Sequence, residues 1–347
     1  MPGMDAPPPR RRELPAGRED TVRDWRFCVA PMMDWTDRHC RYFLRLITRR
    51  ARLYTEMVTA PALRHGDVAR HLDFDPAELP VALQLGGSDP AELAHAARLG
   101  ERRGYDEINL NCGCPSERVQ TGSFGACLMA EPALVADCVK AMRDAVALPV
   151  TVKHRIGLDA NEDYGFVRDF VGTVAAAGCE VFVVHARNAV LKGLSPKENR
   201  EIPPLRYDVV HRLKADFPAL AFVTNGGLAD WTAVERELAS VDGVMLGRTA
   251  YHDPWFLAAV DWKVYGDDAP PRARADVLRA LVPYAERELA RGTPLRAIAR
   301  HVLGLYHGQS GGRRFRQILS DSRLLATAGP QLLLEALAAV EPQASAA

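Results

Sequence analysis

The sequence predicts an α/β fold, a (β/α)8 TIM barrel followed by a small C-terminal helical domain. Short strand-like runs alternate with helical patterns from residue 26 to about 250. About eight strand–helix units within roughly 230 residues fit a closed barrel better than an open doubly wound sheet, which has fewer strands. The first turn, "APMMDWTD" (30–37), also lacks the glycines that follow the first strand of a dinucleotide-binding sheet.

Eight segments read as strands, and several of them are apolar on both faces, as parallel strands buried under helices are. These segments are 26–30, 51–57, 80–86, 107–113, 149–157, 180–186, 220–227 and 242–248.

Helical patterns lie between the strands, among them 89–104, 131–146 and 231–240. Two of these helices begin at recognisable start signals, Asp89 before Pro90 and Glu131 before Pro132.

A break at 264–276, "VYGDDAPPRARAD", separates the barrel from a second run of helical patterns. The expected helices cover 276–292, 295–308, 313–329 and 330–342. The domain organisation is therefore a disordered leader (1–20), a barrel (21–264), a helical domain (265–342) and a frayed tail (343–347).

Composition and charge limit the class of protein. A hydrophobic content of 48% with 25% charged residues is that of a soluble globular protein, and no apolar stretch is long enough to span a membrane. The leader lacks the apolar core of a signal peptide. Seven cysteines, an odd number without a secretion signal, indicate a reducing compartment, which is taken as the cytoplasm.

The formal net charge is zero, but its distribution along the chain is uneven. From residue 271 onward there are 11 arginines, no lysines and 6 acidic residues, a formal net charge of +5. This excess suits an anionic partner, although a solvated helix surface is the commoner reason for it.

Polar residues gather at or near the C-terminal ends of the expected strands, which in a barrel is the active-site face. They are Gln84, Asn109, Asn111, Lys153, His154, His185, Asn225 and Arg248.

Two neighbouring strand ends are rich in glycine, "TNGGL" with Gly226 and Gly227, and "VMLGR" with Gly247. Glycines there let backbone N–H groups approach a phosphate, and Arg248 would be an anion partner. The alternative is that the glycines only make tight turns.

Three polar strand-end residues have distinct interpretations. Three roles compete for Lys153: it forms a Schiff base, it pairs with a buried acid, or it places a cation beside a cofactor ring. His185 is expected to contact a ligand, and Gln84 offers both donors and acceptors to an amide- or imide-containing ring. His154 follows Lys153 directly, so it is expected to point to the opposite face and to be structural.

Cys112 and Cys114 lie two residues apart in "NLNCGCPSERV" and point the same way if the strand continues that far. A metal site would need further ligands at a suitable spacing, and a disulfide across one residue would be strained. A single working thiol at the start of the next loop is the better interpretation, with Asn111 orienting a substrate beside it. Position alone does not choose between the two cysteines.

Several motifs occur in the order found in one family of enzymes. They are "APMMDWTDRHCR", "LYTEMVTA", "VALQLGG", "INLNCGCPSERVQ", "FGACLM", "VKHRIG", "HARNAVLKGLSPKENREIPPL" and "TNGG" followed by "VMLGR". In these motifs the chain resembles the tRNA-dihydrouridine synthases, in particular the A subtype, over most of residues 26–260. The resemblance is weaker over the C-terminal helices.

The resemblance implies an FMN enzyme that acts on D-loop uridines of tRNA at positions 20 and 20a. NADPH would reduce the FMN again after each reaction. Hydride would pass from reduced FMN to C6 of the uracil, and Cys114 would give a proton to C5, leaving Cys112 to pack. The target uridine would have to leave its stack to reach the barrel. The enzyme would be a monomer without a metal.

The resemblance also assigns site residues. FMN would contact Pro31, Met32, Met33, Gln84, Lys153 and His185, with its phosphate at Asn225, Gly226, Gly227, Gly247 and Arg248. Asn111 and Lys192 would reach the target nucleotide, and Arg313 and Arg316 the tRNA backbone. The chain departs from the family pattern at Asn188 and Val190, where a basic residue and an aromatic residue are expected.

Two other functions compete with this interpretation. One is an FMN-dependent dehydrogenase of a free small molecule such as dihydroorotate or a dihydropyrimidine, and the other is an aldolase built on Lys153. A module that only binds RNA would not require a barrel mouth of lysine, histidine, glutamine and cysteine.

Overall fold

A computed structural model of the chain describes residues 24–117, 122–161 and 163–341. The expected leader (1–20) and tail (343–347) lie outside these residues. None of the helices in the described ranges is both long enough and apolar enough to cross a membrane.

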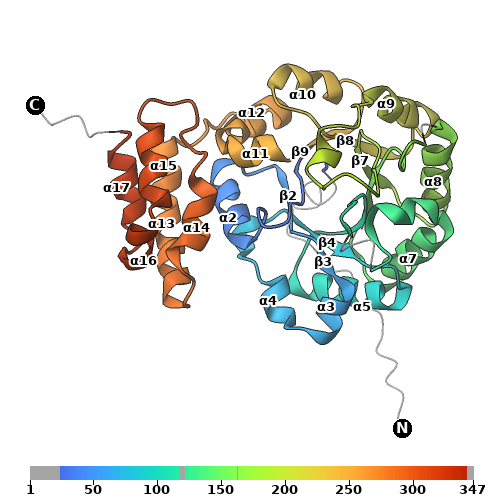
Figure 1. Cartoon of the computed structure of the whole chain (residues 1–347), viewed down its shortest axis with the longest axis horizontal. Coiled ribbons are helices and arrows are strands. Elements are labelled where there is room, and N and C mark those ends of the chain that lie inside the picture. The colour runs from blue at the N-terminus through green and yellow to red at the C-terminus, as the bar shows by residue number, and fades with distance from the viewer. Residues whose placement is uncertain (1–23, 118–121, 162, 342–347) are drawn as a thin grey trace, which may run out of the picture.

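The parallel strands close into a barrel, which confirms the predicted fold (Figure 1). β1 pairs with β2 on one side and with β9 on the other, and β2 pairs with β4, which closes the ring. The two-residue β3 continues the line of β2 along the end of β4. The strands are β1 (Phe27–Val29), β2 (Arg52–Tyr54), β3 (Val58–Thr59), β4 (Val81–Gly86), β5 (Glu107–Cys112), β6 (Val150–Arg155), β7 (Val181–His185), β8 (Ala221–Asn225) and β9 (Gly243–Leu246). Each of the eight expected strand segments contains one strand of the ring.

The two faces of the sheet have different contents. The face toward the helices contributes to the main hydrophobic core, to which Ile108, Leu110 and Cys112 of β5 belong. The barrel interior holds a small apolar cluster that includes Tyr54 and Val183. Beside it, the alternate residues of β5 and β6 are polar, so the interior becomes a polar surface on that side.

Helices surround the barrel, as Figure 1 shows. The α5 start follows the predicted signal, because the Asp89 side chain accepts from the Glu92 N–H. At α7, Pro132 is the first helical residue, but Glu131 makes no side-chain cap. The helices are α2 (Arg38–Ile47), α3 (Ala60–His65), α4 (Val68–Leu72), α5 (Pro90–Arg103), α7 (Pro132–Ala145), α8 (Tyr164–Ala176), α9 (Tyr207–Asp216), α10 (Trp231–Leu238), α11 (Arg248–His252) and α12 (Val260–Tyr265). Short 3₁₀ turns cover Pro76–Glu78, Gly125–Ala130, Glu198–Arg200 and Pro254–Ala259.

Five further helices pack together at the side of the barrel next to α2 (Figure 1). They are α13 (Arg274–Ala290), α14 (Leu295–Val302), α15 (Gly312–Ser320), α16 (Ser322–Thr327) and α17 (Leu332–Ala338). The single helix expected over 313–329 is wrong. It is two helices, because the Asp321 side chain accepts from the Arg323 and Leu324 N–H groups and starts α16. The α14 helix also ends six residues before the expected 308.

Polar contacts join this helical bundle to the barrel at α2. The His39 ring nitrogen Nδ1 lies 2.7 Å from the Tyr284 hydroxyl. Arg38 forms an ion pair with the buried carboxylate of Glu288. The carboxylate of Asp37, which caps α2, contacts Arg300 and His301 of α14. The bundle is therefore held against the start of α2 and the turn that follows β1.

Candidate active site

The barrel places five of the expected site residues at the C-terminal ends of five consecutive strands. Gln84, Asn111, Lys153, His185 and Asn225 are on β4, β5, β6, β7 and β8 respectively. Direct hydrogen bonds join four of them into two pairs. Asn111 Nδ2 donates to Gln84 Oε1 over 2.9 Å, and Lys153 Nζ donates to Asn225 Oδ1 over 3.0 Å. We refer to the end of the barrel around these residues as the barrel mouth.

Cys114 lies where the chain leaves β5, and its backbone is held from several directions. The Asn111 Oδ1 atom accepts from both the Gly113 and the Cys114 N–H groups, over 3.1 and 3.0 Å. The Cys114 carbonyl accepts from the Ala126 N–H. The thiol is partly exposed, and its Sγ lies 3.6 Å from the Ser116 hydroxyl. A partly exposed thiol on a fixed backbone can exchange a proton with a bound molecule.

Cys112 has different surroundings from Cys114. It is fully buried in the main core, where the apolar environment raises its pKa well above that of an ordinary thiol. The expectation that the two side chains point the same way depended on the strand continuing, and β5 ends at Cys112. Both cysteines are free thiols.

Arg155, which the sequence reasoning passed over, connects the Cys114 segment to the loop after β7. Its Nε donates to the Gly113 carbonyl over 3.1 Å, and its NH1 donates to the Asn199 carbonyl over 3.0 Å. The spacing in "VKHRIG" could have revealed it, because alternate residues of a strand share a face and Arg155 is two residues after Lys153.

The electrostatics of the barrel mouth favour anions. Burial, with the neighbouring Arg155, lowers the pKa of Lys153 to about 7. Burial lowers the pKa of His185 well below that of an ordinary histidine, and the nearby arginines and Lys153 lower it further. His185 is therefore neutral at pH 7, while Lys153 titrates near that pH. Arg187 and Arg200, which the sequence reasoning did not select, are among the charges that act on His185.

Backbone conformation and close packing explain why glycine stands at two of the strand-end positions. Gly226 and Gly227 adopt φ values of +112° and +69°, in the region that favours glycine. A Cβ on Gly226 would lie 2.7 Å from the His185 ring. A Cβ on Gly247 would lie 3.4 Å from the Met32 sulfur, an ordinary van der Waals contact, so sterics alone do not require glycine there. Gly226 and Gly227 therefore make turns that other residues would adopt only with strain, and the phosphate expectation at the same backbone stays a prediction.

Arg248 forms an ion pair with Glu201, over 2.7 Å between NH1 and Oε1. Both side chains are about two-fifths exposed, at 41% and 43%. An exposed pair of this kind contributes little to stability, so an anion can compete with the carboxylate for the guanidinium.

The turn after β1 holds Pro31, Met32 and Met33. Met32 is fixed because its N–H donates to the Thr36 hydroxyl over 2.9 Å, whereas the Met33 side chain is 56% exposed. Asp34 follows with φ +65°, and its carbonyl accepts from Arg300 of α14 over 2.6 Å. The bundle therefore contacts a turn that was expected to bind the cofactor.

Other expected residues lie on the surface. Lys192 is exposed in the loop between β7 and α9, and Arg313 and Arg316 are exposed on α15. Their spacing of three residues places the two arginines on one face of α15. His154 is buried against Phe170 and Phe182, which confirms that it points away from the mouth.

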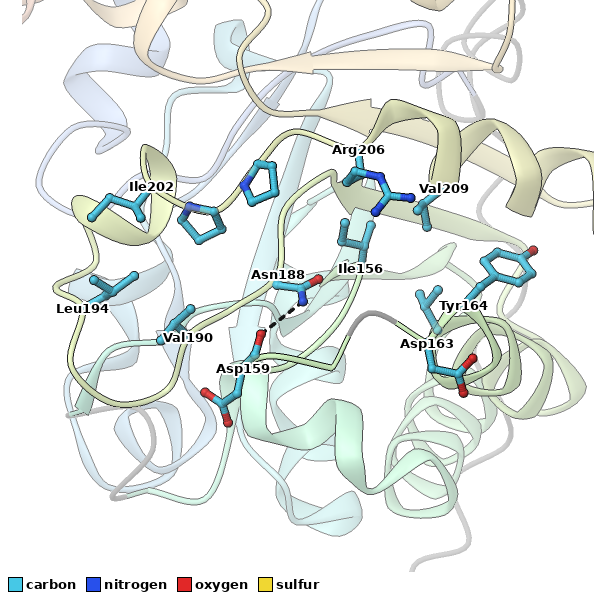
Figure 2. Close-up of a pocket in the computed structure, with 13 residues that line it drawn as sticks. Ile156, Asp159, Asp163, Tyr164, Asn188, Val190, Leu194, Ile202, Arg206 and Val209 are labelled. Atoms are coloured by element: carbon cyan, nitrogen blue, oxygen red, sulfur yellow. Dashed lines mark hydrogen bonds between the residues drawn. The ribbon is translucent and has the colours of Figure 1, made fainter.

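The two departures from the family pattern, Asn188 and Val190, have contacts of their own. Asn188 Nδ2 donates to the carbonyls of Asp159 and Asn161, which ties the loop after β7 to the loop after β6. Figure 2 shows the bond to Asp159. The Val190 N–H donates to the Asn199 side chain. Both residues line a pocket of about 240 Å³. The other lining residues are Ile156, Asp159, Asp163, Tyr164, Val167, Leu194, Ile202, Pro203, Pro204, Arg206 and Val209, so the pocket lies beside the mouth and not in it.

Several known proteins are similar to this chain over most of its length. The chain is 61% identical over 295 residues to the tRNA-dihydrouridine(20/20a) synthase of Pseudomonas aeruginosa, covering 85% of this chain and 89% of that protein. It is 57% identical over 330 residues to the protein of the same name from Xanthomonas campestris pv. campestris, covering 95% and 97% of the two chains. The corresponding protein of Salmonella typhimurium is 55% identical over 324 residues, covering 93% and 97%.

A family comparison covers nearly the whole described chain. The sequence pattern described as dihydrouridine synthase matches residues 28–341, which include both the barrel and the helical bundle. The chain therefore belongs to the dihydrouridine synthase family.

Proposed function

We propose that this protein reduces the C5=C6 bond of uridines at positions 20 and 20a of tRNA to give dihydrouridine. The observation that carries the proposal is the thiol of Cys114, held at the end of β5 beside a mouth of amide donors and cations. The relatives that match along most of the chain are named for this activity. In this proposal the enzyme works in the cytoplasm as a monomer, with NADPH as the reductant.

The residues of the mouth fit FMN, which supplies hydride transfer when it is bound. Gln84, Lys153 and His185 present an amide, a cation and a neutral imidazole at the ends of β4, β6 and β7. The Pro31–Met33 turn would cover an apolar part of the ring system. Asn225, the glycine backbone at Gly226, Gly227 and Gly247, and the guanidinium of Arg248 would hold the phosphate.

Cys114 would give the proton that C5 of the uracil requires. Its backbone is fixed by Asn111 on one side and by Ala126 on the other, so the thiol can move only by rotating about its own Cα–Cβ bond. Lys153 and His185 would balance negative charge that develops during the reaction. Lys153 is suited to this because burial brings its pKa close to 7, and a nearby anion would favour its charged form.

The helical bundle would hold the tRNA. Arg313 and Arg316 of α15, together with Lys192 near the mouth, are exposed cations that can contact backbone phosphates. Asn111 would contact the target base after the nucleotide leaves its stack. The residues from 265 to 342 would then be a tRNA-binding domain on a catalytic barrel of residues 21–264.

Four measurements test the proposal. First, the flavin released from purified protein should be FMN, and recovery of FAD would overturn the cofactor assignment. Second, tRNA from a strain that lacks this gene should lose dihydrouridine at positions 20 and 20a, and reintroducing the gene should restore it. Reduction of orotate or free uracil, with tRNA left unchanged, would instead establish a small-molecule dehydrogenase. Comparing NADPH with NADH in flavin reduction tests the reductant.

A further inference from the structure

Three neighbouring strands carry inward-facing polar side chains at the same height in the barrel. The register pairs Gln84 of β4 with Asn109 of β5, and Asn109 with Thr151 of β6. Their side chains are hydrogen-bonded in the same order. Gln84 Nε2 donates to Asn109 Oδ1 over 2.8 Å, and Asn109 Nδ2 donates to Thr151 Oγ1 over 2.8 Å.

The row of hydrogen bonds ends at a buried acceptor, the carboxylate of Glu107. The Thr151 hydroxyl donates to Glu107 Oε1 over 2.5 Å. Glu107 is fully buried, and it also accepts from the Tyr54 hydroxyl and the Trp25 indole while forming an ion pair with Arg52. A carboxylate surrounded by donors can only accept, so the single hydroxyl hydrogen of Thr151 is committed to Glu107.

The direction of every other bond follows from that commitment. Thr151 Oγ1 is left as an acceptor, so Asn109 must turn its NH₂ group toward Thr151 and its carbonyl toward Gln84. Gln84 in turn must give its NH₂ group to Asn109 and its carbonyl to Asn111. Asn111 then places its Oδ1 against the Gly113 and Cys114 N–H groups, over 3.1 and 3.0 Å. The carboxylate of Glu107 at one end of this row of hydrogen bonds and the backbone N–H groups of Gly113 and Cys114 at the other end require the same amide orientations.

We propose that Thr151 is a positioning residue for the reaction. Because Thr151 donates to Glu107, it fixes the orientation of the Asn109 amide, then of the Gln84 amide and then of the Asn111 amide. The Asn111 amide in turn holds the backbone of Cys114. Thr151 is fully buried, so it acts through these side chains and not by contact with the substrate. This inference rests on the proposed function, because the reacting thiol is that of Cys114.

The same bonds define what Asn111 can offer to a substrate. Its carbonyl already accepts two N–H groups, and one N–H of its amide is given to Gln84. The hydrogen-bonding capacity that remains is one N–H donor, which suits a carbonyl oxygen of uracil. A reversed amide would offer no such donor and would place its NH₂ group against two backbone N–H groups.

The test compares Thr151→Val with Thr151→Ser in the flavin-loaded protein. Valine keeps the shape of threonine and removes the hydroxyl, whereas serine keeps the hydroxyl and removes the methyl group. The measurements are the single-turnover oxidation of pre-reduced flavin by a tRNA transcript with uridine at positions 20 and 20a, and the Kd for that transcript.

We expect Thr151→Val to oxidise its flavin at least about tenfold more slowly, because the reacting groups lose their fixed geometry. Its Kd for the transcript should match that of the wild type, since Thr151 touches no surface. Thr151→Ser should react close to the wild-type rate. A wild-type rate in Thr151→Val, or an equal loss in Thr151→Ser, would overturn the proposal.

Folding and the proposed function are controlled separately. If Thr151→Val does not fold, Thr151→Ala removes the same hydroxyl without adding a methyl group, and the same slow oxidation is expected. If neither variant retains flavin while Thr151→Ser does, the row of hydrogen bonds serves folding and the positioning role is rejected. If the wild type itself does not oxidise its flavin with tRNA, it is the proposed function that fails.

Discussion

Cys112 and Cys114 show how two neighbouring thiols acquire different properties. The side chain of Cys112 follows the alternation of β5 into the main core, where burial raises its pKa. The strand ends there, and Asn111 and Arg155 hold the next two residues at the mouth. A change of backbone direction across Gly113 therefore separates a packing cysteine from a partly exposed one.

Lys153 leads to a prediction about stability and pH. Its pKa is about 7 in the folded protein and about 10.4 in an unfolded chain. Between these values the unfolded chain binds the extra proton, so raising the pH stabilises the folded state. Below pH 7 both states are protonated, and the folded state carries the full cost of the buried charge.

Replacing this lysine by methionine should remove that cost. At pH 6, flavin-free Lys153→Met should be more stable than the wild type, on the order of 2 kcal/mol after allowing for partial exposure. The difference should shrink steadily as the pH rises toward 10. Urea unfolding across this range measures it, and a difference that does not change with pH would show that Lys153 titrates normally.

The sequence could reveal single strand-end residues but not their partners. Gln84, Lys153 and His185 were found because strand ends in a barrel meet at one face. That Lys153 donates to Asn225 and that Arg155 reaches Asn199 depends on contacts across 72 and 44 residues, and these contacts have no local signal in the sequence. Thr151 was missed for a related reason, because threonine is common in strands for its shape alone.

At the scale of elements, α14 is the link between the helical bundle and the mouth. Arg300 donates to the Asp34 carbonyl and to the Asp37 carboxylate, over 2.6 and 2.8 Å. Trp35 of the same turn stacks on Tyr251, with ring centroids 4.5 Å apart. The turn expected to contact FMN is therefore braced by a helix outside the barrel.

Replacing Arg300 by methionine should loosen this turn. We expect Arg300→Met to lose about 1 kcal/mol of stability, since the ion pair is partly exposed, and to retain FMN less well. Urea unfolding and the flavin content after dialysis measure the two effects. Arg279→Met is the matched control, because Arg279 forms an exposed ion pair with Asp276 of its own helix. Equal flavin retention in the two variants would show that the contact between Arg300 and this turn does not support flavin binding.

The α15 helix carries the prediction about RNA. Reversing Arg313 and Arg316 to glutamate should weaken tRNA binding and flatten its dependence on salt, because each lost phosphate contact removes counterion release. NADPH oxidation by the bound flavin should be unchanged. Arg98→Glu with Arg102→Glu, which makes the same charge change on exposed positions of α5, is the control. If both double variants bind tRNA alike across a salt series, the RNA surface lies elsewhere.

Helix boundaries within the bundle were the least predictable part of the fold. The pattern over 313–329 is continuous in hydrophobicity, but Asp321 gives its side chain to two backbone N–H groups and divides the helix. An aspartate in a helical pattern can equally point to solvent, so the sequence did not decide between the two structures.

At the scale of the whole molecule, the barrel was the more predictable part. Each strand carries its own apolar run, and the closure of the ring follows from the number and twist of parallel strands. The charge of the chain is zero in total, with the basic excess confined to the C-terminal helices. Residues 21–264, the barrel, hold 29 basic and 32 acidic residues, a formal net charge of −3. A basic helical surface beside a slightly acidic barrel suits an anionic substrate such as tRNA.

The most direct test of this function compares Cys114→Ala with Cys112→Ala in the single-turnover oxidation of pre-reduced flavin by tRNA. Cys114→Ala should still bind FMN, accept hydride from NADPH and bind tRNA, since these steps do not use the thiol. It should form dihydrouridine about 10²–10⁴-fold more slowly, which is the usual contribution of a general acid. Cys112→Ala should keep most of its activity with a modest loss of stability. A fast Cys114→Ala enzyme and a slow Cys112→Ala enzyme would reverse the assignment. Wild-type rates in both variants would show that neither thiol donates the proton.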